Sequence, residues 1–118
     1  MECKYKKVLF LCTSNINRSK TAEHLAADLF DNIEVKSAGL STKECLRNNS
    51  TLCTEELIHW ADVIFTFEPM HEQRIREHLG NVVLNIINLD IEDIYTYYQP
   101  ELVDILTRKL MHRRVKLR

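Results

Sequence analysis

The chain has 118 residues, 45% of them hydrophobic, which fits one compact domain over residues 1–118 with a single core. Its formal net charge of -1 at pH 7 gives no electrostatic reason to expect nucleic acid or an anionic membrane as a partner. The four cysteines lack paired spacing, which argues against a disulfide framework and a zinc site and predicts reduced thiols in the cytoplasm.

The first predicted elements are a buried strand and a helix, joined by a polar turn. Residues 8–11 form an apolar run that predicts a strand and is too short for a signal peptide or a membrane span. Residues 18–30 predict a helix, so residues 12–19 make up a strand-to-helix turn. A second strand is predicted over residues 33–37, ending at Gly39.

A loop, a short helix and a third strand are expected next. Residues 40–54 are polar, rich in Ser, Thr and Asn, and predict a loop. Thr54 and the two glutamates after it give a capped start to a short helix that runs to Trp60. Residues 61–66 then predict a third, fully buried strand.

The last part of the chain alternates in the same way. Pro69 opens a helix over residues 69–79 that is stopped by Gly80. Residues 82–87 predict the fourth strand, and a final helix with one apolar face covers residues 101–114. Alternating strands and helices predict an α/β fold, a four-stranded parallel sheet with helices on both faces in a single three-layer domain.

The turn after the first strand has the chemistry of a phosphate-binding loop. A strand-to-helix turn aims backbone N–H groups and the positive end of a helix dipole at one point, which suits a dianion. Of the four cysteines, Cys12 alone has an arginine six positions on, Arg18, in a Cys-x5-Arg pattern. The helix terminus and the guanidinium favour a thiolate nucleophile at Cys12. Arg18 would grip two phosphoryl oxygens, and Ser19 would donate a hydrogen bond to the sulfur.

A second group of residues is expected at the same place. In parallel sheets of this type, ligands bind beyond the carboxyl ends of the strands. Cys12 follows the first predicted strand, and the acidic segment of residues 89–95 follows the fourth. Both belong to the same rim of the sheet.

Nearly the whole chain resembles the low-molecular-weight protein tyrosine phosphatases, in their short bacterial form. The residues that carry the likeness are Val8 to Cys12, Asn15, Arg18 with Ser19, Thr21 to Glu23, Ser37 to Gly39, Trp60 to Phe65, Leu89 to Ile91, Asp93 with Tyr95, and Pro100 to Leu102. The resemblance implies a protein tyrosine phosphatase that works through a phosphocysteine intermediate, with no metal and no cofactor. Its partner would be a phosphorylated protein or a small aryl phosphate, and we expect a monomer.

The resemblance also implies a role for each residue of the turn. Cys12 is the nucleophile, Arg18 binds the phosphoryl oxygens in the transition state, and Ser19 is the partner of the thiolate. The remaining residues of the turn are expected to bind substrate: Thr13, Ser14, Asn15, Ile16 and Asn17. Asparagine tolerates left-handed backbone, so Asn15 is expected to shape the loop.

By the same resemblance, Asp93 is the general acid that protonates the departing phenolate and later the base toward water. A positioned proton donor is worth about 10²–10⁴ in rate. Asp90 and Glu92 are neighbouring rivals, but Asp93 alone has a tyrosine two positions on. That tyrosine, Tyr95, is expected to form an aromatic wall for the substrate ring or else to pack on the loop.

The sequence departs from the family pattern in three places. Ser14 stands where many members have glycine, so the loop must avoid a positive φ there or absorb its strain. Asn17 replaces a second cysteine that could protect Cys12 as a reversible disulfide. The region of residues 40–60 is shorter than in longer relatives, where it helps to wall the pocket.

Other functions remain open from the sequence. The loop also resembles that of eukaryotic phosphatases that act on phosphoserine. A thioredoxin-linked arsenate reductase would need two relay cysteines, for which Cys45 and Cys53 are candidates by number. A phosphoryl carrier and a non-catalytic phosphate-binding relative share the placement of the cysteine, although a carrier would not need Arg18 and Asp93.

Two histidines, His71 and His78, lie on the helix of residues 69–79. They are seven positions apart without a third ligand at helical spacing. We expect both to be solvated and neither to bind metal.

Overall fold

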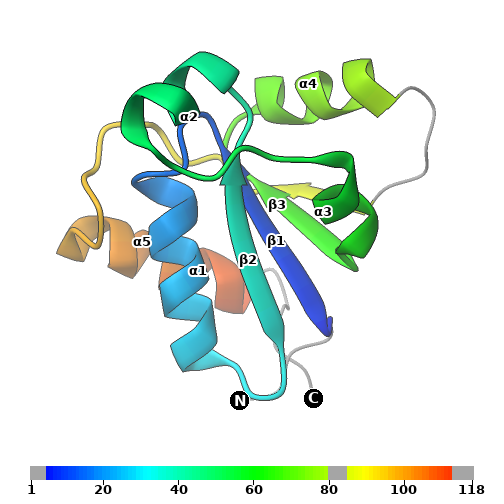
Figure 1. Ribbon diagram of the computed structural model, residues 1–118. Helices are drawn as coiled ribbons and strands as arrows, with labels where there is room; N and C mark the ends of the chain where they lie inside the picture. The colour runs from blue at the N-terminus through cyan, green and yellow to red at the C-terminus, as the bar shows by residue number, and fades with distance from the viewer. Residues whose placement is uncertain (1–4, 80–84, 113–118) are drawn as a thin grey trace.

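The computed structural model describes residues 5–79 and 85–112 of the chain (Figure 1). Strands and helices alternate along most of these residues. In chain order they are β1 (Lys7–Cys12), α1 (Arg18–Leu29), β2 (Glu34–Gly39), α2 (Thr42–Asn48), α3 (Glu55–Trp60), β3 (Val63–Thr66), α4 (Pro69–Leu79), β4 (Ile86–Asn88) and α5 (Pro100–His112).

The described strands form one four-stranded sheet in the order β2-β1-β3-β4, and every neighbouring pair is parallel. The predicted α/β architecture is confirmed. β1 lies between β2 and β3, so the loop that leaves its carboxyl end stands near the middle of the rim (Figure 1). Such a position suits a ligand site because loops from several strands surround it.

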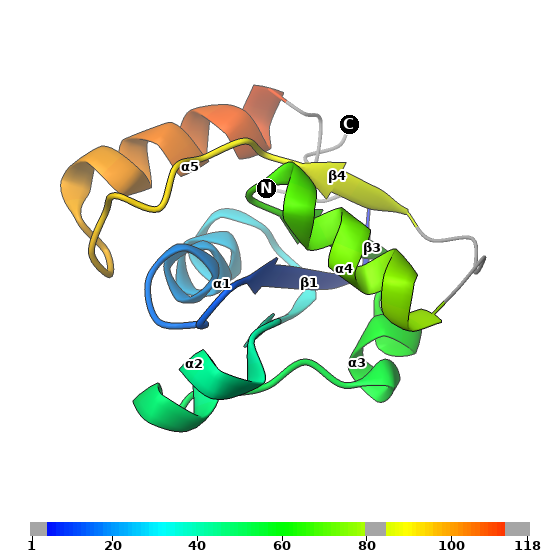
Figure 2. The ribbon, with the colours of Figure 1, turned by 90° about the horizontal axis from the view of Figure 1, so that it is seen from above.

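Helices cover both faces of the sheet, and β1 contributes side chains to both cores. Val8 and Phe10 point into a cluster with α1 and α5, whereas Leu9 and Leu11 point into a second cluster with α3 and α4. This alternation is the two-residue period of a strand. Figure 2 shows the two pairs of helices on opposite sides of the sheet. A strand buried on both faces needs apolar residues throughout, which explains the continuous run in β1.

The predicted loop over residues 40–54 is wrong in part, because α2 lies within it. Ser41 caps this helix, its Oγ accepting a hydrogen bond from the backbone N–H of Glu44 at 3.2 Å. Asn49 ends the helix in the left-handed conformation with φ of 52°. A serine cap followed by a glutamate three residues later is a helix-start signal that the polar composition concealed.

Element boundaries differ elsewhere by a few residues. β3 starts at Val63 rather than at residue 61, because Ala61 caps the end of α3 and the Asp62 carboxylate accepts from the backbone N–H of Lys7 at 2.9 Å. β4 covers Ile86–Asn88, shifted from the predicted residues 82–87. Part of that prediction, the stop at Gly80 and the end of the last helix at residue 114 lie outside the described residues. Within the described part of the chain, no helix has the length and apolar character needed to span a membrane.

Candidate active site

The sulfur of Cys12 lies at the centre of the turn that connects β1 to α1, residues 12–19, which we call the phosphate loop. Cys12 is the last residue of β1 and its side chain is buried. Its Sγ is 2.9 Å from Ser19 Oγ, and the backbone N–H of Asn15 donates to it at 3.3 Å. The Asn15 N–H stabilises negative charge on the sulfur, and the Ser19 hydroxyl is placed to donate to a thiolate as well.

Asn15 shapes the phosphate loop from within. It adopts a left-handed φ of 56°, and its side chain is fully buried. Its Nδ2 donates to Ser19 Oγ at 2.8 Å and to Ser37 Oγ at 2.9 Å, while its Oδ1 accepts from the N–H of Thr51 at 3.3 Å. Ser14 is not among the described residues with positive φ, so the loop takes its left-handed turn at asparagine, which tolerates it.

The segment that follows β2 supports the phosphate loop through hydrogen bonds to its backbone carbonyls. The N–H of Leu40 donates to the carbonyl oxygen of Cys12 at 2.9 Å, and that of Ser41 donates to Thr13 O at 3.0 Å. A Cβ on Gly39 would lie 2.5 Å from Cys45 Sγ and 2.8 Å from Thr13 O, so the close approach requires glycine. The region predicted as a loop therefore holds the backbone of the candidate site.

Arg18 is buried, with 1% of its side chain exposed, and is held from one side. Its Nη1 donates to the carbonyl oxygen of Ile91 at 2.8 Å and pairs with Glu68 Oε2 at 2.8 Å. Its Nε is also buried and has no hydrogen-bond partner among the described residues. A buried donor without an acceptor is costly, and a phosphoryl oxygen would satisfy it.

Asp93 is the predicted acid that the structure brings to the arginine. It lies on the loop between β4 and α5, residues 89–99, which we call the acid loop. Its Oδ1 is 3.6 Å from Arg18 Nε, and its side chain is 57% exposed. The rivals Asp90 and Glu92 are exposed, and in the described part of the chain neither makes an ion pair with Arg18.

The other predicted site residues differ in how accessible they are. Thr13, Ser14 and Asn17 are half-buried on the phosphate loop, and Ile16 is exposed at 37%. Tyr95 is half-buried and packs against the core on the side of α1 and α5. Among the described residues, no three His, Cys, Asp or Glu side chains are grouped so as to hold a metal ion.

The expectation that His71 is solvated is wrong. The residue is fully buried, and its Nδ1 accepts from the backbone N–H groups of Phe67 at 3.2 Å and Glu68 at 3.3 Å. Its Nε2 lies 3.2 Å from Thr13 Oγ1 and must carry the proton, because Nδ1 is an acceptor. Burial, and next the positive charge of Arg18, lower the pKa of His71 from 6.5 to about 4. This neutral imidazole caps α4 and braces the phosphate loop.

Sequence reasoning missed Glu68 and His71 as supports of the candidate site. A signal was present, because a side chain at the third position of a helix often reaches back to the N–H of the capping residue. His71 does so at the start of α4, where Glu68 precedes Pro69.

We expect His71 to make folding stability depend on pH. With a pKa of about 4 in the folded chain and 6.5 in the unfolded chain, the unfolded state binds a proton between these values and the folded state does not. The stabilising contribution is therefore complete above about pH 6.5 and is lost as the pH falls toward 4, by about 3 kcal/mol. Urea unfolding at pH 7 and at pH 4 should show this loss in the wild type and a smaller one in His71→Gln. Equal losses would contradict the assignment.

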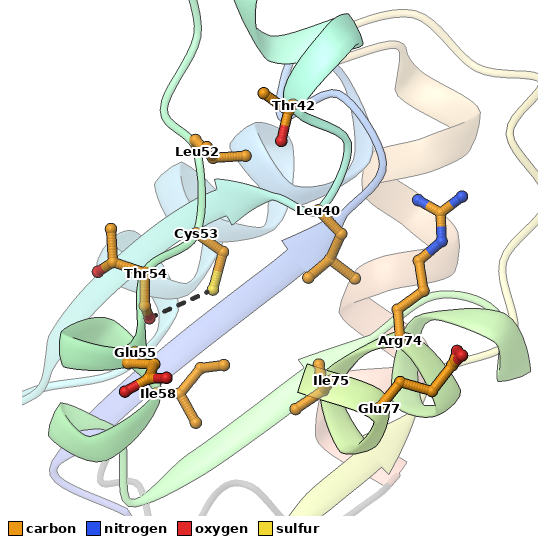
Figure 3. A pocket seen from close by; sticks show the side chains of 10 residues that line it. All are labelled: Leu40, Thr42, Leu52, Cys53, Thr54, Glu55, Ile58, Arg74, Ile75 and Glu77. Atoms are coloured by element: carbon orange, nitrogen blue, oxygen red, sulfur yellow. Dashed lines mark hydrogen bonds between the residues drawn. The ribbon is translucent and has the colours of Figure 1, made fainter. Parts of the chain in front are cut away.

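A cavity of about 480 Å³ lies apart from the predicted site residues, beside α3 and α4 (Figure 3). Leu40, Ile58 and Ile75 line it together with Cys53 and Arg74. Burial, and next the nearby Cys45, raise the pKa of the Cys53 thiol to about 11. This thiol stays protonated at neutral pH and is a poor nucleophile for a disulfide relay.

Comparison with known proteins points to one family. Residues 7–56 match the family model described as low molecular weight phosphotyrosine protein phosphatase. No curated protein matches the chain in sequence. Solved structures with the same fold include Wzb from Vibrio vulnificus in complex with benzylphosphonate, 20% identical with a TM-score of 0.72, an alignment that covers 95% of this chain and 99% of that one.

Two further solved structures have the same fold. The low molecular weight protein tyrosine phosphatase SP-PTP from Streptococcus pyogenes is 17% identical with a TM-score of 0.75, and the alignment covers 92% of this chain and 90% of that one. The YwlE arginine phosphatase from Geobacillus stearothermophilus is 22% identical with a TM-score of 0.66, with coverage of 92% and 94%. The fold implied by the resemblance is confirmed, and the family model matches the resemblance over residues 7–56.

Proposed function

Because this chain has the low molecular weight phosphatase fold and carries the sequence signature of that family in residues 7–56, we propose that it is a cysteine-dependent protein tyrosine phosphatase. The observation that carries the proposal is the arrangement around one sulfur. The backbone N–H of Asn15 donates to Cys12 Sγ, and the Ser19 hydroxyl lies within hydrogen-bond distance of the same sulfur. The Arg18 guanidinium beside Asp93 has a buried N–H without an acceptor among the described residues. A phosphoryl group fits both requirements at once.

The first chemical step transfers the phosphoryl group to sulfur. The Cys12 thiolate attacks phosphorus, so a P–S bond forms while the bond from phosphorus to the substrate oxygen breaks. Protonated Asp93 gives its proton to the departing oxygen, which leaves as a neutral phenol. In the second step water attacks phosphorus, and Asp93 takes a proton from this water. The P–S bond then breaks, inorganic phosphate leaves, and Ser19 stabilises the thiolate that returns.

Arg18 stabilises the phosphoryl group as charge moves across it. The contacts of Nη1 with Ile91 O and Glu68 fix one side of the guanidinium plane, so Nε keeps a constant direction. A donor that is oriented before the substrate arrives needs no reorganisation during the reaction.

An aryl phosphate is the substrate class that the surroundings favour. Ile16 on the phosphate loop and Ile94 beside Asp93 are exposed at 37% and 66%. Apolar side chains on both loops suit an aromatic ring better than a short polar chain. We therefore propose phosphotyrosine in a phosphorylated protein, or a small aryl phosphate, as the substrate of a monomeric enzyme in the cytoplasm.

The decisive experiment is hydrolysis of p-nitrophenyl phosphate in the presence of EDTA, beside peptides that carry phosphotyrosine, phosphoserine or phosphoarginine. We expect turnover of p-nitrophenyl phosphate and of the phosphotyrosine peptide, and none by Cys12→Ser. Preference for phosphoserine or phosphoarginine would overturn the substrate class. Lack of any hydrolysis would favour a phosphoryl carrier or a non-catalytic relative.

Arsenate reduction is the less favoured alternative. A relay would have to pass a disulfide from Cys12 to further thiols. Cys45 is buried at 2% exposure, its sulfur lies under the backbone of the phosphate loop, and the pKa of Cys53 is raised to about 11. These environments do not suit mobile, reactive thiols.

We expect Asp93→Asn to affect substrates according to their leaving groups. Phenyl phosphate needs a proton on its departing oxygen, so its turnover should fall by about 10²–10⁴. Turnover of p-nitrophenyl phosphate should fall much less, because p-nitrophenolate leaves without protonation. Steady-state kcat on both substrates measures the difference, and Glu92→Gln is the matched control. Equal losses on the two substrates would count against Asp93 as the acid.

A further inference from the structure

The proposed acid is on an exposed part of its loop, so its position must be set by the backbone on either side. Asp93 is 57% exposed, and its neighbour Ile94 is 66% exposed. Side chains in contact with water do not by themselves fix a loop to the accuracy that proton transfer requires. The contacts that hold the two ends of the acid loop therefore bear on the reaction.

Lys109 of α5 holds the start of the acid loop. Its Nζ donates to the carbonyl oxygen of Leu89 at 2.7 Å and to that of Asp90 at 3.1 Å. Asp90 is left-handed with φ of 55°, a conformation in which the chain turns sharply. An ammonium that donates to two successive carbonyls makes hydrogen bonds stronger than neutral ones.

The segment held by Lys109 leads directly to the arginine and the acid. The N–H of Ile91 donates to Phe67 O at 3.0 Å, and the carbonyl oxygen of Ile91 accepts from Arg18 Nη1 at 2.8 Å. Ile91 is buried and lies two residues before Asp93. A shift of this backbone would move the arginine contact and the acid together.

Thr21 holds the other end of the acid loop. Its Oγ1 accepts a hydrogen bond from the backbone N–H of Tyr98 at 2.9 Å. Thr21 is fully buried on α1, the helix that also carries Arg18 and Ser19. Tyr98 has a left-handed φ of 57°, which places a second sharp turn at this anchor.

We propose that Lys109 and Thr21 are positioning residues for the acid: they fix the two ends of the acid loop so that Asp93 reaches the leaving group. The inference rests on the proposed function and adds two residues to its machinery that do not touch the substrate. Lys109 acts by charge-assisted hydrogen bonds to the backbone, and Thr21 acts as a buried acceptor.

The test measures the ratio of kcat for p-nitrophenyl phosphate to kcat for phenyl phosphate. Misplacing the acid harms the substrate that needs a proton, so Lys109→Met should raise this ratio by about tenfold. Lys109→Arg, which can still donate to both carbonyls, should restore most of it. Arg108→Met is the matched control, because Arg108 lies on the same helix, is exposed and contacts Asp104 of its own helix.

Thr21 is tested in the same way. Thr21→Val removes the acceptor with little change of shape and should raise the ratio severalfold, whereas Thr21→Ser should keep it near the wild-type value. Hydrogen exchange gives a readout independent of turnover: amides of the acid loop should exchange faster in Lys109→Met than in Arg108→Met.

An unchanged ratio in both Lys109→Met and Thr21→Val, or unchanged exchange in the acid loop, would overturn the positioning role while leaving the proposed function intact. A wild-type chain that hydrolyses neither aryl phosphate would overturn the proposed function itself. If a variant lowers both substrates equally and also lowers the melting temperature, its residue supports folding rather than the acid.

Discussion

Replacing Cys12 with serine is expected to lower the turnover of p-nitrophenyl phosphate by about 10⁴-fold or more. The serine hydroxyl occupies nearly the same volume, but the described groups that contact this position, Ser19 Oγ and Asn15 N–H, are not bases that could ionise it. A hydroxyl is a far weaker nucleophile than a thiolate. The phosphate loop should keep its conformation, because Asn15 is held by Ser37 and Thr51 independently of the sulfur. The variant should therefore still bind phosphate or vanadate.

Two measurements separate these effects, steady-state turnover and calorimetric titration with vanadate. Cys53→Ser is the matched control, because Cys53 lines the cavity beside α3 and α4 and should not change turnover. Substantial activity in Cys12→Ser would refute the nucleophile assignment. Loss of vanadate binding together with turnover would show instead that the substitution had disturbed the loop.

The sheet could be predicted from the sequence because its strands are short and strongly apolar. β1 is buried at nearly every position, so its sequence is an uninterrupted run of apolar residues between polar segments. The position of the phosphate loop between β1 and α1 could be predicted for a related reason. Its Cys-x5-Arg pattern is local, and it falls between a strand pattern and a helix pattern.

Two elements of the candidate site could not be predicted in this way. α2 buries only Cys45 among its residues, so it lacks the apolar periodicity that identifies a helix. The contacts of Arg18 are made by residues distant in sequence, since Ile91 is 73 positions away. No local pattern connects such residues, and the fold alone brings them together.

His71 shows that the environment of a polar residue depends on where the fold places its helix. A histidine on a polar helix is expected in solvent, but α4 crosses the rim of the sheet beside the phosphate loop, where Thr13 offers a hydroxyl. The start of the helix supplies two backbone donors to the other ring nitrogen. The imidazole is satisfied on both sides, which explains how a polar ring is tolerated in the interior.

The second large effect is expected for Arg18→Lys, which should lower kcat by about 10³-fold although the charge is kept. Arg18 uses Nη1 for Ile91 O and Glu68, and its Nε, a separate nitrogen of the same guanidinium, stays available for another acceptor. Lysine has a single nitrogen, so its ammonium must either stay with Glu68 and Ile91 or turn toward the phosphoryl group. The variant should also bind vanadate more weakly.

This prediction distinguishes planar recognition from simple charge attraction. If Arg18 contributed only positive charge, lysine would retain most of the rate, and comparable kcat values in the two proteins would contradict the bidentate role. Arg74→Lys is the matched control, because Arg74 lies on α4 at the separate cavity and should leave kcat unchanged. Melting temperatures of both variants should accompany the kinetics, because Arg18 is buried. A fall in kcat without a matching fall in stability would assign the loss to the transition state, where the Nε–H gains an acceptor that it lacks among the described residues.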